Sequence, residues 1–177
     1  MFAQPLYLSG LTINNASHNV VFVATEHDSV YAFDADAAGA ALWQTSFLIN
    51  GATTASPSSV HSTIGTEIGI TGTPVIDMSG TPNPVLYVVA ETNEGGSYFH
   101  RLHALDVTTG KEISGSPVNI SSSGFSAKQQ LQRPALILAN GNVYISFGSE
   151  GDNTPWHGWI FGFNTANLSG APVVWNS

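Results

Sequence analysis

Apolar and polar residues alternate along much of the chain, in short runs bounded by Gly, Asn, Asp, Ser or Pro. The run 30–34 (VYAFD) places valine, alanine and aspartate on one side and tyrosine and phenylalanine on the other, and the run 102–106 (LHALD) repeats this order. A period of two puts successive side chains on opposite faces of a β-strand. The enrichment in Val, Ile, Tyr and Phe also favours strands over helices. The pattern therefore predicts an all-β chain.

The same pattern occurs three times along the chain. Each copy begins at a proline and its third run ends 29, 32 or 30 residues later at an aspartate or asparagine; the pairs are Pro5 and Asp34, Pro74 and Asp106, and Pro134 and Asn164. Proline suits the first residue of a strand, where no ladder N–H is needed. We expect the Asp or Asn side chain to bond backbone N–H groups of the following turn. A fourth strand is expected next, most clearly at 42–47 and 172–175.

Four antiparallel strands per copy are typical of a β-propeller blade, which must bury its faces against neighbouring blades. Within a single repeat domain, 1–177, we expect blades at about 1–48, 72–120 and 133–177, with the connections 49–71 and 121–132 as surface insertions. Propellers usually close with about 4 to 8 blades. We therefore expect the chain to be a fragment of a larger ring, or to self-associate through its open blade edges.

The segments that carry these copies are similar to a known repeat. They are VFVATEHDSVYAFDADAAGAALWQTSF at 21–47, EIGITGTPVID at 67–77 with LHALDVTTGKE at 102–112, and QRPALILANGNVYISFGSEGDNTPWHGWIFGF at 132–163. Together they resemble the quinoprotein-like, or pyrroloquinoline quinone-binding-like, β-propeller repeats over nearly the whole chain. The resemblance implies a partial β-propeller of about three four-stranded antiparallel blades, like that of quinoprotein alcohol dehydrogenases. It also implies that Trp43 and Trp175 brace neighbouring blades.

The resemblance further implies pyrroloquinoline quinone and calcium in those members that are dehydrogenases. Such enzymes typically place an adjacent cysteine pair beside the quinone, a tryptophan beneath it, and Glu, Asn and Asp around calcium. This chain has no cysteine. Its Asp34, Asp36 and Gly39 begin like a calcium loop, but Ala38 and Thr45 stand where an oxygen ligand and the closing glutamate are needed. We therefore predict no cofactor and no metal site.

The sequence contains no G-x-S-x-G nucleophile elbow, phosphate loop, H-E-x-x-H motif or dinucleotide fingerprint. A repeat without catalytic motifs favours a non-catalytic binding or scaffold module. The alternative, which the resemblance keeps open, is a fragment of a quinone-dependent oxidoreductase (dehydrogenase).

The charge of the chain narrows the class of partner that it can bind. Charged residues make up 9% of the chain, against about 25% in ordinary proteins, and the net charge is −8. This composition argues against nucleic acid and anionic lipid, and leaves a protein or saccharide ligand. Few lysines among many Ser, Thr and Asn are typical of secreted proteins, so an extracellular or periplasmic location is expected, although 1–10 does not resemble a signal peptide. No apolar run approaches the ~18 residues of a membrane span.

The candidate ligand-binding residues gather at the turns between the second and third strands. His27, His100 and His157 lie seven, six and seven residues before the turn Asp or Asn, so we expect them on one face. Third strands of neighbouring blades diverge, so a shared zinc ion is not expected. The loop 148–159 (GSEGDNTPWHGW) adds acceptors and an aromatic plate, which suit a hydroxylated ligand or calcium. The full set is Glu26, His27, His100, Glu150, Asp152, Asn153, Trp156 and His157.

A structural interpretation of the same residues remains open. The histidines would then hydrogen-bond at blade edges, and the carboxylates of the loop 148–159 would cap their own backbone. Both interpretations place the residues on the blade face that carries the turns between second and third strands.

Overall fold

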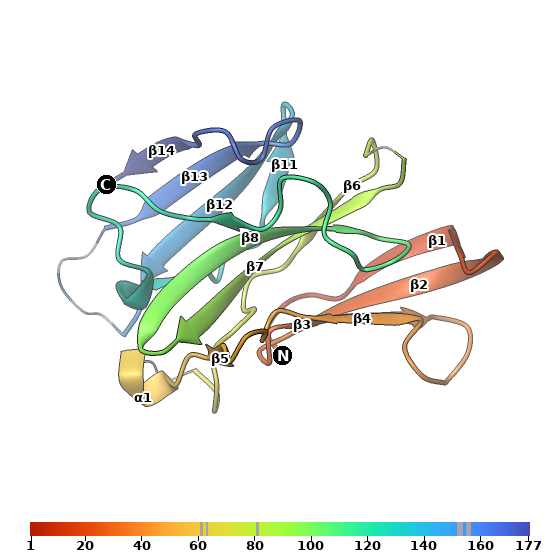
Figure 1. Ribbon diagram of the computed structural model, residues 1–177, viewed down its shortest axis with the longest axis horizontal. Helices are drawn as coiled ribbons and strands as arrows, with labels where there is room; N and C mark the ends of the chain where they lie inside the picture. Colours follow the sequence, from red (N-terminus) through yellow and green to blue (C-terminus); the bar gives the residue numbers. More distant parts are fainter. Residues whose placement is uncertain (61, 63, 81, 152–153, 155–156) are drawn as a thin grey trace.

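The strands form three antiparallel sheets in a computed structural model that describes residues 1–60, 62, 64–80, 82–151, 154 and 157–177 (Figure 1). The first sheet contains β1 (Leu6–Ile13), β2 (Ala16–Thr25), β3 (Ser29–Asp34) and β4 (Trp43–Ser46), in that order. The second contains β5 (Thr53–Thr54), β7 (Val85–Glu94), β8 (Ser97–Asp106) and β9 (Val118–Asn119), with β6 (Val75–Asp77) on β7. The third contains β10 (Gln130–Leu131), β12 (Asn142–Ser149), β13 (Trp159–Asn164) and β14 (Val173–Asn176), with β11 (Ile137–Ala139) on β12. The predicted all-β fold with three blades is confirmed.

The turn after each third strand is built as the sequence predicts. β3, β8 and β13 end at Asp34, Asp106 and Asn164. In each case a side-chain oxygen accepts a hydrogen bond from the backbone N–H two residues later, at 2.8, 2.8 and 3.0 Å. The turn residue thus satisfies backbone donors that the ladder leaves free.

The middle sheet is covered on both of its faces. β7 is buried at eight consecutive positions, because its alternate side chains pack in opposite directions. Leu86 and Val88 belong to the core shared with the first sheet, whereas Tyr87 and Val89 belong to the core shared with the third. Figure 1 shows this order, with the orange, green and blue sheets following one another.

Trp43 braces the first two blades, as the resemblance implies. Its Nε1–H donates to the carbonyl of Val107 at 2.9 Å. Its ring lies against Gly110, where an added Cβ would come within 2.4 Å of Cε3 and where φ is +68°, so only glycine fits this contact. Trp175, by contrast, is 49% exposed on the third sheet.

The two long connections are in part built into the sheets, where surface insertions were expected. β7 has 10 residues and its first-strand partner β6 only 3, so the far end of β7 needs another partner, which β5 provides. β10 does the same for β12. The short helix α1 (Pro57–Val60) and a 3₁₀ turn, η1 (Ala127–Gln129), also lie in these connections. Among the described residues, no helix has the length and apolarity to span a bilayer.

Candidate functional site

Two of the candidate residues lie at the surface and are paired. The carboxylate of Glu26 accepts a hydrogen bond from the N-terminal ammonium of Met1 at 2.7 Å. The Nδ1 of His27 lies 2.9 Å from the carboxylate of Glu67, and this hydrogen bond is the main reason that the pKa of Glu67 is lowered. The first contact joins the turn of the first blade to the N-terminus, and the second joins it to the connection 49–71.

His100 is only 1% exposed, so its ring is enclosed by the protein. Its Nε2–H donates to the carbonyl oxygens of Gln130 and Ala127, at 2.8 and 3.1 Å. Burial lowers the pKa of His100 to about 4, although the two carbonyl bonds oppose this change. The ring is therefore neutral at physiological pH and fixes β10 and η1 against β8.

His157 lies near β10, the strand whose Gln130 carbonyl accepts a hydrogen bond from His100. Its Nδ1 is hydrogen-bonded to the carbonyl of Ser177 at 2.5 Å. With the amide oxygen and nitrogen of Gln130 exchanged, the orientation that satisfies both atoms, this side chain donates to the carbonyl of His157 at 3.1 Å. Gln130 therefore connects His157 to His100. Asp152, Asn153 and Trp156 lie outside the described residues, so the role of this loop stays a prediction.

Three carboxyl groups are buried near the ends of the second strands: Asp28, Glu91 and Glu150, each at most 2% exposed. Burial raises the pKa of Asp28 and Glu91 well above their ordinary values, Glu67 adds to the rise for Asp28, and Glu150 and Asp28 add to it for Glu91. Burial also raises the pKa of Glu150, against a hydrogen bond from Ser62. No carboxyl oxygen of Asp28 or Glu91 has a hydrogen-bond partner among the described residues. The backbone of Glu91 acts to lower the pKa of Asp28, but burial outweighs this effect.

This centre does not fit pyrroloquinoline quinone. The quinone bears carboxylates and needs cationic partners, whereas the centre contributes further carboxyl groups. Three of the four lysines and arginines have other neighbours, and the fourth, Lys111, is exposed: Arg101 pairs with Glu94, Arg133 lies over Phe2, and Lys128 lies over Tyr98. In the described ranges, no three His, Asp or Glu side chains are arranged to hold a metal ion.

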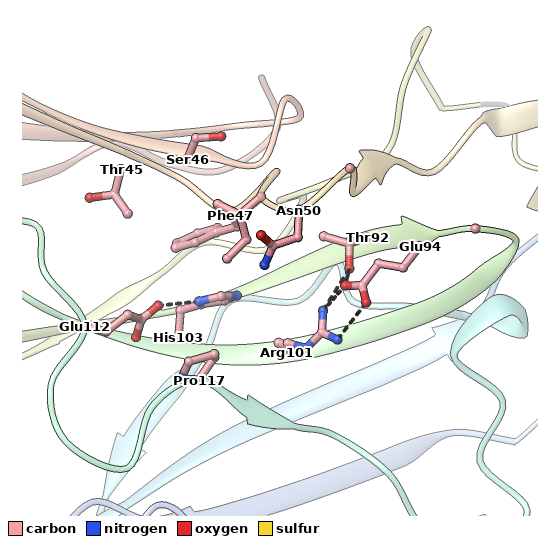
Figure 2. A pocket seen from close by; sticks show the side chains of 13 residues that line it. Thr45, Ser46, Phe47, Asn50, Thr92, Glu94, Arg101, His103, Glu112 and Pro117 are labelled. Carbon is pink, nitrogen blue, oxygen red and sulfur yellow. Dashed lines mark hydrogen bonds and ion pairs between the residues drawn. The ribbon is translucent and has the colours of Figure 1, made fainter.

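A groove between the first two blades is the other candidate site (Figure 2). Its volume is about 370 Å³. One wall is the segment 45–51, which consists of the end of β4 and the residues that follow it. The other wall is formed by β7, β8 and the segment before β9. The polar and aromatic lining residues include Phe47, Asn50, Thr92, Arg101, His103 and Glu112.

Arg101 holds one end of this groove. Its guanidinium makes an ion pair with both carboxylate oxygens of Glu94, and it also donates to the hydroxyl of Thr92 at 3.1 Å. Figure 2 shows these three side chains converging. The hydrogen bond from Arg101 is the main cause of the lowered pKa of Glu94. The charges at this end are thus paired within the protein.

His103 and Phe47 form the other end. Their rings are stacked, with centroids 3.6 Å apart and an angle of 19° between the planes. The Nδ1 of His103 lies 2.5 Å from the carboxylate of Glu112, which also accepts the hydroxyl hydrogen of Ser116. Glu112 therefore orients the imidazole, and the stacked pair forms a flat surface between the blades.

Sequence reasoning did not find the groove. Its walls come from different copies of the repeat, so its residues share no motif. One signal was available: at the position of His103, three residues before the turn Asp or Asn, the other copies have Tyr31 and Phe161. In the second copy an imidazole thus takes the place of a tyrosine or phenylalanine ring, and it lines the groove.

Comparison with known proteins extends the structural result. No family model matches the chain, and no curated protein matches it. The crystal structure of the quinohemoprotein alcohol dehydrogenase from Comamonas testosteroni matches all of this chain with a TM-score of 0.61. The chain has the fold of part of a quinoprotein β-propeller. The chain is 20% identical to that enzyme and spans 23% of its length, so the likeness concerns the fold and not the activity.

Proposed function

We propose that this quinoprotein-like chain is a non-catalytic binding module whose groove takes a small, neutral, hydroxyl-rich ligand of the saccharide class. The observation that carries this proposal is the groove between the first two blades, which combines apolar surface with polar side chains that are paired within the protein. Its volume of about 370 Å³ lies within the ~300 to 1,000 Å³ typical of small-ligand sites.

The paired charges favour a neutral ligand. Arg101 is already bound to Glu94, and His103 to Glu112, so a charged ligand would have to compete with these pairs. A hydroxyl group both donates and accepts hydrogen bonds. It can therefore bind the remaining lone pairs of the carboxylates and the remaining N–H groups of Arg101 without breaking the two pairs. The net charge of −8 further disfavours anions.

The remaining lining residues match the two kinds of surface on a sugar. Asn50 offers an amide at the groove, whereas the hydroxyl of Thr92 is already bonded to Arg101 and Glu94. Ile49 and Pro117 offer apolar surface for the C–H face of a ring. Among the described lining residues, no hydroxyl group is hydrogen-bonded to the Nε2 of His103, the nitrogen that would act as a base, so the groove shows no nucleophile–base pair.

The experiment is a titration of the folded chain with a panel of neutral mono- and disaccharides by calorimetry and ligand-observed NMR. Asn50→Ala should weaken binding by about 5- to 10-fold, the effect of one lost hydrogen bond. Gln4→Ala, an exposed side chain outside the groove, is the matched control. His157→Ala tests the turn face instead. No binding to the panel, or binding that only His157→Ala weakens, overturns the groove assignment.

The second candidate is a fragment of a quinone-dependent oxidoreductase. The observation in its favour is the fold shared with a quinohemoprotein alcohol dehydrogenase. It predicts alcohol-dependent dye reduction by the chain when pyrroloquinoline quinone and calcium are added. A folded chain that shows no stimulation by either addition removes this candidate.

A further inference from the structure

Ser116, Glu112 and His103 form a short chain of hydrogen bonds at one end of the groove, and chemistry fixes the direction of each bond. The backbone N–H of Ala104 donates to the Oγ of Ser116 at 2.7 Å, and a backbone N–H can only donate. The Ser116 hydroxyl therefore keeps its own hydrogen for Glu112, where it donates to Oε2. The other carboxylate oxygen of Glu112, Oε1, lies 2.5 Å from the Nδ1 of His103.

The hydrogen of this last bond belongs to His103. Imidazole is a stronger base than a carboxylate, so a hydrogen shared between Oε1 of Glu112 and Nδ1 of His103 resides on the nitrogen. In a neutral imidazole one ring nitrogen donates and the other accepts, and the hydrogen bond of the first nitrogen sets the role of the second. The second nitrogen of His103, Nε2, is then a hydrogen-bond acceptor.

Nε2 of His103 faces the groove. The ring lines the groove and is stacked on Phe47, and no described residue is hydrogen-bonded to Nε2. In Figure 2, Glu112 approaches the ring from one side and the second ring nitrogen lies on the other side, towards the middle of the groove. An acceptor without a protein partner is thus held at a fixed place in the groove wall.

Arg101 places a hydrogen-bond donor on the same wall. It lies two residues before His103 on β8, so both side chains point to one face of the sheet, about 7 Å apart along the strand. Its guanidinium is bound to Glu94 and Thr92 but has further N–H groups. The wall therefore offers a donor and an acceptor at a spacing that suits two oxygens of one sugar ring.

We propose that His103 is a specificity-determining residue of the groove: its Nε2 accepts a hydrogen bond from a ligand hydroxyl group, and Glu112 positions the ring for this role. The groove then selects a sugar whose oxygen at this place carries a hydrogen. An ether oxygen or a fluorine there meets the lone pair of Nε2 without a hydrogen between them, so binding is weaker. This inference rests on the proposed function and deepens it.

The first test needs no ligand. ¹⁵N NMR of the imidazole rings in the folded chain at pH 8 shows which nitrogens carry a hydrogen. His103 should have a protonated Nδ1 and an unprotonated Nε2, with its signals assigned from their loss in His103→Phe. A hydrogen on Nε2, whether alone or together with one on Nδ1, overturns the inference because Nε2 would then be a donor.

Glu112→Ala tests the positioning role. Without the carboxylate, part of the hydrogen should move from Nδ1 to Nε2 of His103, an effect that a merely structural contact would not have. Glu67→Ala is the matched control, because Glu67 contacts the Nδ1 of His27 outside the groove at 2.9 Å. It should leave the His103 signals unchanged. A folded Glu112→Ala variant with unchanged His103 signals overturns the positioning role, and the wild-type spectrum keeps the inference falsifiable if this variant does not fold.

The second test uses D-glucose, D-galactose and D-mannose with their monofluorinated forms, in which one hydroxyl is replaced by a fluorine that cannot donate. For a sugar that binds, at least one fluorinated form should bind about 5- to 10-fold more weakly than its parent. His103→Phe introduces the residue that the third copy has at this position, Phe161, and keeps an aromatic ring against Phe47. In this variant the difference between that fluorinated form and its parent should disappear.

The outcomes separate this inference from the proposed function. If a sugar binds but no loss caused by fluorine depends on His103, the inference is overturned and the proposed function stands. If none of the sugars binds, the proposed function is overturned, and the specificity assigned to His103 with it. Circular dichroism and cooperative unfolding confirm that each variant is folded.

Discussion

Two glutamates three residues apart on β7 have opposite surroundings. Glu91 is 2% exposed and its carboxyl group has no hydrogen-bond partner among the described residues. Glu94 lies at the groove and is bound to Arg101 (Figure 2). The pKa of Glu91 is raised by burial and the pKa of Glu94 is lowered by its partner. Burial therefore favours the neutral form of this side chain at one place, and an ion pair favours the charged form at the other.

Two histidines on β8 also have different surroundings. His100 is 1% exposed, and burial lowers its pKa and favours the uncharged ring although its two bonds to carbonyl oxygens oppose this. His103, three residues further on, faces the groove and contacts the carboxylate of Glu112. The β7–β8 hairpin thus runs from a buried end of uncharged acids and a neutral imidazole to a groove of paired charges. The groove is a better candidate than the buried end for ligand recognition at neutral pH. Its ion pair lies near solvent, so it avoids the free-energy cost of burying a charge.

Phe47 joins the groove to the core, and its removal should have the largest effect. Phe47→Ala is expected to lower the free energy of unfolding by about 3–4 kcal/mol, because the ring is 6% exposed and stacked on His103. Urea denaturation followed by fluorescence measures the change. Ile49→Ala is the matched control in the same segment; Ile49 is 63% exposed, so the change should stay within about 0.5 kcal/mol. Equal losses in the two variants would mean that Phe47 is not part of the core.

Glu91→Gln tests the buried end of the hairpin. The folded-state pKa of Glu91 is above its ordinary value of 4.5, so the protonated form stabilises the fold below that pH and the stability is lost as pH rises through the folded-state pKa. The amide cannot ionise. Glu91→Gln should therefore be more stable than the wild type by about 1–3 kcal/mol at pH 8, and the gain should shrink towards pH 4.

The measurement is urea denaturation of both proteins between pH 4 and pH 8. Asp28→Asn should behave in the same direction, because burial raises the pKa of Asp28 as well. A Glu91→Gln variant that is less stable than the wild type at pH 8 would show that Glu91 is charged and paired, and the contrast with Glu94 would disappear.

The fold could be predicted because its signals are local. A period of two is visible within five residues, and the side chains of Asp34, Asp106 and Asn164 bond N–H groups only two residues away. β5 and β10 gave no such signal. Each has two residues and exists because the far end of a longer strand needs a partner, which depends on the lengths of elements elsewhere in the sheet.

The site was harder to predict for the same reason. The sequence singles out His100 for a ligand face, but its exposure depends on η1 and β10, which lie about 30 residues later and cover it. The groove forms where segment 45–51 meets the second sheet, and no single copy of the repeat contains it. A contact between copies has no sequence pattern until the order of the blades is known.

Glu94→Gln is the smallest of these changes and tests the groove end directly. The folded-state pKa of Glu94 is below its ordinary value of 4.5, so the ion pair stabilises the fold above that pH and the stability is lost as pH falls through the folded-state pKa. The side chain of Glu94 is 36% exposed, so solvent screens the pair and Glu94→Gln should cost only about 0.5 kcal/mol at pH 7. Denaturation at pH 7 in low salt and in 0.5 M salt, with Glu91→Gln as the control on the same strand, measures it. The loss should shrink at about 0.5 M salt because the pair is near the surface. A loss that is independent of salt would place Glu94 in a buried pair, and the groove would then resemble the opposite end of the hairpin in its solvation.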